Sequence, residues 1–246
     1  MKKLVNALTL VAAVAVSSSA FAACRDLPKY DALKAALIAA RTADADQTPK
    51  GNGGFNLDMW GTIVDRDGTV CAVAFTGMAR GDQWLGSRVI SAQKANTANA
   101  FSLPHLALST ANLYTATQPS GSLFGLQMSN PVDTSVAYGG NASHFGAKGD
   151  PMVGKKIGGI NVFGGGLALY DASGKLLGAV GVSGDSSCAD HNIAWRTRKN
   201  LALDNVPSGV GPGGKDGIDY TVGSGWAHPV CSQDAKDIAV RIGAGG

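Results

Sequence analysis

The chain has 246 residues, of which 45% are hydrophobic and 16% are charged, and its formal net charge is +3. This length is sufficient for one substantial hydrophobic core. The charge is too small to favour nucleic acid or an anionic membrane as a partner, because proteins bind both through dense positive patches.

Residues 1–22 have the pattern of a cleavable export signal. Lys2 and Lys3 precede an uncharged, mostly apolar run over residues 4–16. The segment ends in Ala20-Phe21-Ala22, a small-x-small sequence typical of signal peptidase sites. The apolar run is shorter than the about 20 residues that a membrane-spanning helix needs, so we do not expect it to remain as a membrane anchor.

We therefore expect a soluble periplasmic or secreted protein that comprises residues 23–246. Loss of the two signal lysines lowers the net charge from +3 to +1, and no later stretch of the sequence predicts stable membrane insertion. Lipidation of Cys24 is an alternative. A lipidated cysteine is the first mature residue and follows a branched apolar residue, and Phe21-Ala22-Ala23 does not match that pattern. We favour the form without lipid.

The sequence contains four cysteines, an even number that indicates two disulfides in an exported protein. They are Cys24, Cys71, Cys188 and Cys231. Three connectivities are possible, and we favour Cys24–Cys71 with Cys188–Cys231, because this pairing ties down both ends of the chain. The sequence has no C-x-x-C, so neither a redox motif nor a zinc ribbon is supported.

In the first half of the chain, the hydrophobic spacing predicts helices around one β-hairpin. Apolar residues recur at helical spacing from Tyr30 to Ala40, and the turn Asp65-Arg66-Asp67-Gly68 separates two β-rich runs. In chain order, the predicted elements are a helix over 28–43, strands over 59–64 and 69–75, and helices over 84–101 and 106–117.

The second half begins with a glycine-rich, polar stretch over 129–159. We interpret it as an ordered insertion, because a structureless stretch of this length is unusual in a compact domain. Its apolar side chains, which we expect to be buried, are Val132, Tyr138, Phe145 and Met152. The hairpin pattern then repeats around residues 171–174, and Asp185 or Ser186 is suited to cap the next helix. The predicted elements are strands over 166–170 and 175–182, a helix over 188–203, a Gly/Pro loop over 207–217 and a helix over 232–242.

A hairpin followed by a helix thus occurs twice in the sequence. Strands that come as hairpins form an antiparallel sheet, and the helices must cover its faces. The sequence therefore predicts the α+β class. We expect residues 23–246 to form a single domain that carries the insertion over 129–159 and a disulfide-tied C-terminal extension over 204–246.

Two segments resemble the GlcG/HbpS family of haem-binding proteins. Lys94-Ala95-Asn96-Thr97-Ala98 is similar to the family's Lys-Ala-x-Thr-Ala helix, and the second hairpin ends in Gly181-Val182-Ser183-Gly184, similar to the family's Gly-Val-Ser-Gly. In order and spacing, the similarity covers roughly residues 29–203. It implies a profilin-like or PAS-like antiparallel sheet flanked by helices, a homo-oligomer, and binding or breakdown of haem for some members. The first helix contains no histidine to serve as a haem ligand.

A haem needs an apolar slot and a His, Met, Cys or Tyr that coordinates the iron. His191 and His228 each lie three residues from a cysteine of the C-terminal pair. If those cysteines are bonded, their Cα atoms lie about 5.5 Å apart. The two histidines would then lie in one neighbourhood, where both could coordinate one haem iron or another metal. Asp190 or Asp185 would orient an imidazole. The alternative is that both histidines only form hydrogen bonds around a structural disulfide.

Further candidates lie near the Lys-Ala-x-Thr-Ala helix. His105 follows that helix, which the resemblance places near the ligand, although a lone histidine is also typical of a helix cap or a surface. Lys94 and Thr97 share a helix face and would meet a haem propionate; the alternative is a solvated lysine beside a packed threonine. His144 lies in the insertion and is a candidate lid ligand.

The leading hypothesis is an exported haem-binding protein that acts as a haem carrier, scavenger or redox-sensing accessory. The second is a haem-independent periplasmic module that senses or binds a small molecule or a partner protein. The third is an enzyme that degrades haem oxidatively, in which the iron and a bound oxidant supply the chemistry. We favour a protein without catalysis and assign no catalytic residue.

Overall fold

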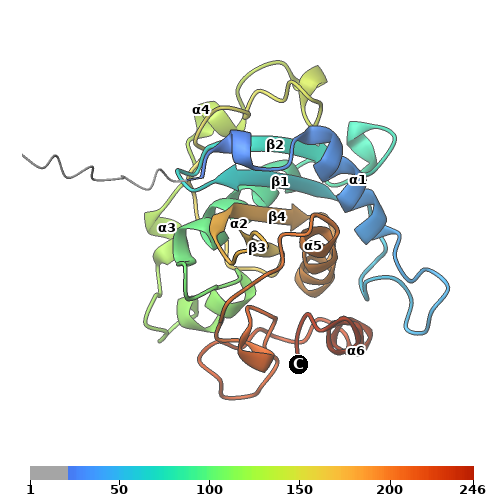
Figure 1. Ribbon diagram of the computed structural model, residues 1–246, viewed down its shortest axis with the longest axis vertical. Helices are drawn as coiled ribbons and strands as arrows, with labels where there is room; N and C mark the ends of the chain where they lie inside the picture. The colour runs from blue at the N-terminus through green and yellow to red at the C-terminus, as the bar shows by residue number, and fades with distance from the viewer. Residues whose placement is uncertain (1–21) are drawn as a thin grey trace, which may run out of the picture.

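The structure is a computed structural model that describes residues 22–246, so the export signal predicted at residues 1–22 lies, except for Ala22, outside the described residues. Its centre is a four-stranded antiparallel sheet with the strand order β2-β1-β4-β3 (Figure 1). The strands are β1 (Trp60–Asp65), β2 (Val70–Phe75), β3 (Gly166–Tyr170) and β4 (Leu176–Ser183). The two strands of each predicted hairpin pair with each other, β1 with β2 and β3 with β4. The pairing of β1 with β4 joins the two hairpins into one sheet. The predicted α+β class is confirmed.

Three helices cover the two faces of the sheet. They are α1 (Tyr30–Arg41), α2 (Ser87–Phe101) and α5 (Ser187–Asn200). Helices α1 and α5 pack on one face and α2 packs on the other (Figure 1). Side chains of a strand alternate between the faces, so Val180 and Val182 join the core under α1 and α5 while Ala179 joins the core under α2. Ser186 caps α5, because its hydroxyl accepts the N–H of Ala189 at 3.4 Å.

Two glycines allow α2 to approach the sheet closely. Gly166 of β3 and Gly181 of β4 are cross-strand partners. A Cβ atom at Gly181 would lie 1.9 Å from the carbonyl oxygen of Ser91, and one at Gly166 would lie 2.5 Å from that of Lys94. The backbone of α2 therefore rests directly on the sheet here, which no residue with a side chain would permit.

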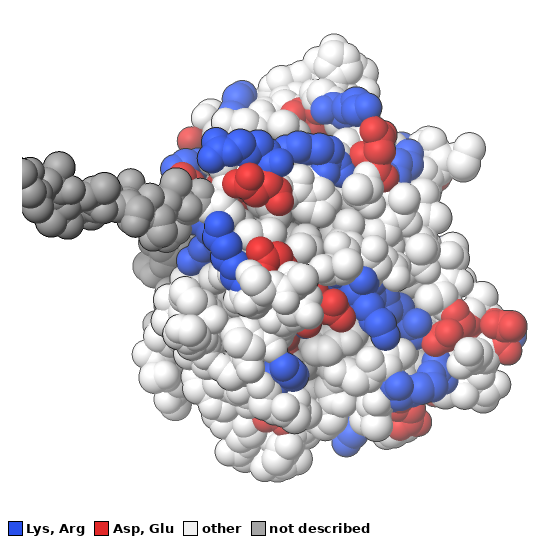
Figure 2. Space-filling view, in the orientation of Figure 1, with Lys and Arg blue, Asp and Glu red and all other residues white. Residues whose placement is uncertain are grey.

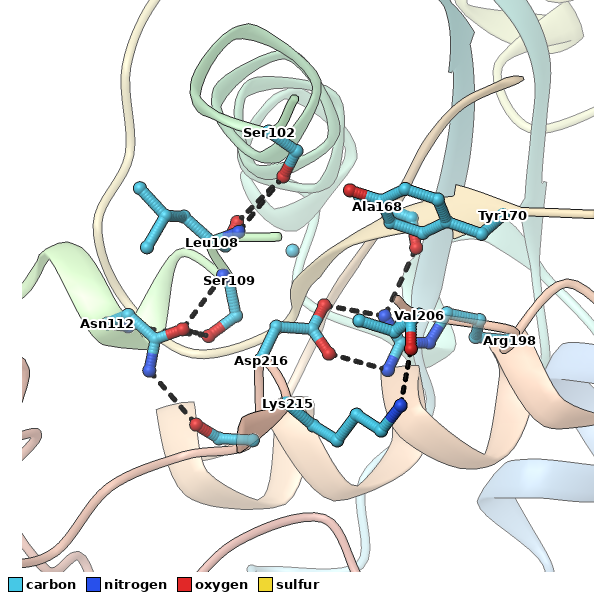
Figure 3. A network of polar contacts seen from close by, with 12 residues as sticks. Ser102, Leu108, Ser109, Asn112, Ala168, Tyr170, Arg198, Val206, Lys215 and Asp216 are labelled. Carbon is cyan, nitrogen blue, oxygen red and sulfur yellow. Dashed lines mark hydrogen bonds and ion pairs between the residues drawn. The ribbon is translucent and has the colours of Figure 1, made fainter. Parts of the chain in front are cut away.

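The predicted helix over 106–117 is wrong. The segment contains two single 3-10 turns, over 111–113 and 115–117. Its polar side chains bond to nearby groups in competition with helical hydrogen bonds. The Oδ1 atom of Asn112 accepts both the backbone N–H and the hydroxyl of Ser109, at 3.0 and 2.8 Å (Figure 3).

The insertion over 129–159 is ordered. Two short helices, α3 (Leu126–Ser129) and α4 (Thr134–Ala137), lie at its start. Three of its apolar side chains pack in the core under α2, as expected: Val132, Phe145 and Met152. Tyr138 is 66% exposed, so its expected burial is wrong. Asp150 anchors the insertion to α2 through a buried ion pair with Arg88, whose Nε lies 2.8 Å from Oδ2.

The C-terminal extension over 204–246 folds back onto α5, where a buried ion pair holds it. Arg198 donates to the two carboxylate oxygens of Asp216 at 2.6 and 2.9 Å, and to the carbonyl of Ala168 in β3 at 3.1 Å (Figure 3). Both charged side chains are at most 1% exposed. The extension ends in α6 (Gln233–Ile242), which packs against α5.

Both disulfides have the favoured pairing. Cys24–Cys71 joins the N-terminal segment to β2, and Cys188–Cys231 joins α5 to the C-terminal extension, with Cα atoms 6.0 Å apart. Residues 22–246 contain no free cysteine. Within the same residues, no helix has the length and apolar character needed to cross a membrane.

We expect Arg198→Leu to lower the free energy of unfolding by about 3–5 kcal/mol, because it leaves the buried Asp216 carboxylate without a counter-charge. Urea denaturation followed by circular dichroism measures this change. The double variant Arg198→Leu/Asp216→Leu should recover most of the loss, since no isolated charge remains. Arg25→Leu is the control, because Arg25 is 76% exposed and should change stability little. Equal effects of Arg198→Leu and Arg25→Leu would contradict the assignment.

Candidate functional site

A buried lysine–aspartate pair lies at the end of β4, where the two helical layers meet. Lys94 of α2 donates from Nζ to Oδ2 of Asp190 in α5 at 2.7 Å and to the carbonyl of Val182 at 3.1 Å. The two charged side chains are 2% and 3% exposed. The other carboxylate oxygen of Asp190 accepts the backbone N–H of Asp185 at 2.9 Å. The solvated lysine considered from the sequence is therefore wrong.

Burial raises the pKa of Asp190 to about 6, and the neighbouring Lys94 ammonium opposes that rise. The carboxylate is therefore ionised at neutral pH and pairs with the ammonium. Asp185 serves a different purpose, because its carboxylate accepts the backbone N–H groups of Phe55 and Leu57 at 2.8 and 3.1 Å. The expectation that Asp190 or Asp185 orients an imidazole is wrong, since the partners of both are groups other than histidine.

His191 lies in the same helix as Asp190 and is fully buried. Its Nε2 is 3.2 Å from the carbonyl oxygen of Ala244 in the C-terminal extension. Because a carbonyl oxygen only accepts, Nε2 carries the proton, and the lone pair is on Nδ1, which has no partner among the described residues. Burial lowers the pKa of His191 to about 3, so the imidazole is neutral at physiological pH.

His228 lies in the C-terminal extension beside the Cys188–Cys231 disulfide. Its Nδ1 is 2.8 Å from the carbonyl oxygen of Pro229 and 3.9 Å from Sγ of Cys188. The proton is therefore on Nδ1, and Nε2 keeps a lone pair that is buried without a partner in residues 22–246. Burial lowers the pKa of His228 to about 4. His191 and His228 therefore each keep one unpartnered ring nitrogen within the described residues.

Aromatic side chains lie next to His228 at the surface. The ring centroid of Tyr114 is 5.0 Å from that of the imidazole, and the ring of Phe163 is 6.3 Å from the ring of Tyr114. Phe163 is 44% exposed, and Trp226, two residues before His228, is 39% exposed. We call Tyr114 and Phe163 the aromatic face. It places an apolar surface beside a neutral, buried histidine.

The remaining candidates lie elsewhere. His105 and His144 are exposed, and His144 ends a 3-10 turn in the insertion. Thr97 is buried, donates to the carbonyl of Gln93 at 2.8 Å and accepts the N–H of Asn161 at 2.9 Å. It is the packed threonine that the sequence analysis considered as an alternative.

Two cavities lie away from all four histidines. The first has a volume of about 490 Å³ and is enclosed by the loop after α1, the start of α5 and the start of α6. The second is a groove of about 620 Å³ between α1 and the end of α5, lined mainly by alanines. Neither cavity adjoins the aromatic face.

The described residues supply nitrogen donors that could coordinate a haem iron, but the two cavities described above do not enclose a haem beside these donors. A neutral histidine with an unpartnered ring nitrogen is a usual iron ligand, and His228 and His191 both provide one. Cys188 and Cys231 surround His228 but are joined in a disulfide, so they offer no thiolate to a metal. Both unpartnered nitrogens are covered, and neither cavity reaches them. The two cavities therefore do not supply the haem slot, and His228 presents a covered ligand nitrogen beside an apolar surface.

The family model described as "Haem degrading protein HbpS-like" matches residues 27–198. The chain belongs to the HbpS-like family. A comparison with curated proteins finds no match. Similar solved structures include a PduOC:heme complex, which is 24% identical, with a TM-score of 0.46, covering 73% of this chain and 98% of that chain. Klebsiella pneumoniae protein ORFY, of the DUF336 family, is 20% identical, with a TM-score of 0.47, covering 77% and 97%.

A crystal structure of HbpS is 14% identical to this HbpS-like chain, with a TM-score of 0.43, covering 78% of this chain and 99% of that chain. The family match ends at residue 198, so the candidate ligand residues are divided between two parts of the chain. His191 and Lys94 lie in the family segment, whereas His228 and the aromatic residue Trp226 lie in the C-terminal extension beyond it.

Sequence reasoning missed the Lys94–Asp190 pair and the 490 Å³ cavity. Lys94 stands among residues of α2 that are buried on both sides of it in the sequence, such as Ala92 and Ala95. A lysine on an otherwise small, apolar helix face is a signal that it needs a buried counter-charge. The identity of its partner depends on the fold, because Asp190 is 96 residues away.

The neutral histidines predict a pH dependence of stability. Folding lowers the pKa of His191 from 6.5 to about 3 and that of His228 from 6.5 to about 4. Between pH 6.5 and these lower values, the unfolded chain therefore binds more protons than the folded chain. Their contribution to stability is complete above pH 6.5 and is lost as the pH falls toward about 4. Asp190 acts in the opposite direction, because its pKa is raised by burial.

The measurement is urea denaturation from pH 7 to about 4 for the wild type and His228→Gln. The variant should lose stability less steeply, by up to about 1.4 kcal/mol per pH unit, because one group that protonates on unfolding is gone. His144→Gln is the control, since His144 is exposed. Parallel pH profiles for the wild type and His228→Gln would contradict a neutral, buried His228.

Proposed function

We propose that the chain is an exported haem-binding protein that acts as a haem carrier, scavenger or redox-sensing accessory. The observation that carries this proposal is membership of the HbpS-like family over residues 27–198. The PduOC:heme complex among the similar solved structures is named for a haem ligand, but its likeness to this chain is too distant to add weight. Haem would supply a redox-active iron, and the chain would supply the axial ligand and the apolar contacts.

Within the chain, we assign the axial ligand to His228. Its Nε2 carries a lone pair without a partner, and the exposed aromatic face beside it offers stacking surface to a porphyrin. His191 is the second candidate ligand, because its side chain is fully buried and its Nε2 is bonded to the carbonyl of Ala244. His105 is the next candidate ligand, because it is exposed near α2. Lys94 and Thr97 are weaker candidates for contacts to the haem propionates, because both already form hydrogen bonds with other groups of the chain.

The remaining parts of the proposal concern partners and processing. Basic and acidic side chains are interspersed over the face in Figure 2, which does not favour nucleic acid as a partner. We also propose a homo-oligomer, in keeping with the large apolar side chains exposed at Met78, Trp84 and Leu85. The second candidate function is haem-independent binding of a small molecule, which the 490 Å³ cavity favours.

A hemin titration of residues 23–246 tests haem binding. We expect a saturable Soret shift with a defined stoichiometry, and a changed Soret position or about tenfold weaker binding in His228→Ala, because the axial ligand is lost. The same titration of His191→Ala, His105→Ala and His144→Ala identifies the ligand, and circular dichroism confirms that each variant is folded. A featureless titration of the wild type would refute haem binding. An unchanged His228→Ala with a changed His105→Ala would move the ligand to His105.

The titration also separates binding from degradation. Loss of the Soret band under peroxide or reductant, with iron released faster than from free hemin, would favour an oxidative haem-degrading enzyme. A stable Soret band under the same conditions would favour a carrier or sensor.

Export predicts a mature chain that begins at Ala23 and contains no free thiol. Intact mass spectrometry of the protein recovered from the periplasm or medium measures the start, and a thiol assay after denaturation counts the cysteines. Ala22 is buried, and its carbonyl accepts the N–H of Arg66 at 3.4 Å, a contact that cleavage after Ala22 would remove. A mass with an attached lipid, or two reactive thiols per chain, would contradict the assignment.

A further inference from the structure

The 490 Å³ cavity is separate from the proposed haem site, because none of the four histidines lines it. It is lined mainly by the loop after α1, together with Asp185, Ile193 of α5 and Asp234 of α6. Figure 1 shows this loop on the same side of the molecule as α6. Its volume is within the range of about 300–1,000 Å³ that is typical of small-molecule sites. Apolar side chains, including those of Leu57 and Ile193, form part of its lining.

One buried polar atom of the lining has no partner. Asn52 is 8% exposed, and its Nδ2 donates to the carbonyl oxygens of Ala40 and Arg41 at 3.1 and 3.3 Å. These two bonds fix the orientation of the amide, because carbonyl oxygens only accept. Oδ1 of Asn52 is left without a donor among the described residues. Oδ1 is covered by protein atoms, so the amide forms part of the wall of the cavity and does not itself contact a ligand.

Two charged side chains of the lining are occupied in holding the loop. Arg41 donates to the backbone oxygens of Asn56 and Leu57 at 2.7 and 3.3 Å. Asp185 accepts backbone N–H groups of the same loop, as described above. They shape the cavity and are not free to bind a ligand.

Lys50 and Asp234 are the other charged residues of the lining. Both are exposed, and neither forms an ion pair or side-chain hydrogen bond with another residue in 22–246. Lys50 comes from the loop and Asp234 from the first turn of α6, so opposite charges reach one cavity from two different elements. A polyanion is disfavoured by the carboxylates of Asp185 and Asp234, and a simple cation would leave Lys50 without a partner.

We propose that this cavity binds a small zwitterion, an α-amino acid with an apolar side chain. The carboxylate of the ligand pairs with Lys50, and its ammonium group donates to Asp234. Its side chain packs against Leu57 and Ile193. This proposal rests on the second candidate function, small-molecule binding, and names its ligand class; the site is separate from the proposed haem site, so it does not fail if haem binding fails.

Isothermal titration calorimetry with a panel of the common α-amino acids tests the proposal on residues 23–246, with and without hemin. We expect saturable binding of members with apolar side chains, and equal affinity with hemin present. Lys50→Ala and Asp234→Ala should each weaken binding by about tenfold or more, because each removes one charge-assisted contact. The N-acetyl and methyl ester forms of the best ligand should bind more weakly for the same reason.

Matched controls are Lys175→Ala and Asp204→Ala, which remove exposed charges outside the cavity and should leave binding unchanged. A further variant, Ala45→Trp, fills the cavity from an exposed position and should abolish binding without changing the circular dichroism spectrum. The absence of binding by every amino acid, or equal binding of the doubly blocked ligand, would overturn the proposal. Binding that survives Ala45→Trp would also overturn it, because the ligand would then lie elsewhere.

Discussion

The ion pair between Lys94 and Asp190 fixes the relation between the two helical layers. Burying either charge alone costs several kcal/mol, so the two side chains must meet with good geometry and satisfied hydrogen bonds. Lys94 reaches Asp190 past the end of β4 because α2 rests on the glycines of the sheet. Asp190 in turn accepts the N–H of Asp185, and the Asp185 carboxylate holds the loop at residues 55–57. One interior contact thus connects α2, α5 and the wall of the 490 Å³ cavity.

Local chemistry was sufficient to predict much of the fold. The Asp-Gly and Ser-Gly turns fix both hairpins, and the hydroxyl of Ser186 identifies the start of α5, because such signals act within a few residues. The segment over 106–117 had helical spacing, but Ser109 and Asn112 bond to each other instead. Patterns of hydrophobicity do not record such side-chain competition.

The candidate site was less predictable, because its contacts join distant residues. The Cys188–Cys231 bond was predictable, because cysteines can be counted and paired in the sequence, and it places His228 beside Cys188. The contact of His191 with Ala244 and the unpartnered Oδ1 of Asn52 depend on how the C-terminal extension and the loop after α1 pack. Nothing in the local sequence specifies that packing. The extension beyond residue 198 closes over α5 and makes His191 inaccessible, so it modifies the interior of the family segment as well as lengthening the chain.

The order of the cysteines has a consequence for how an exported chain matures. Each cysteine is bonded to the next one along the sequence, at separations of 47 and 43 residues, and the two loops do not overlap. When a chain crosses a membrane from its N-terminus, Cys24 and Cys71 emerge together before either of the others. An oxidase that joins cysteines in their order of appearance would therefore install both native bonds directly. Disulfides of this kind are typical of oxidising compartments, and this connectivity places no demand on a disulfide isomerase.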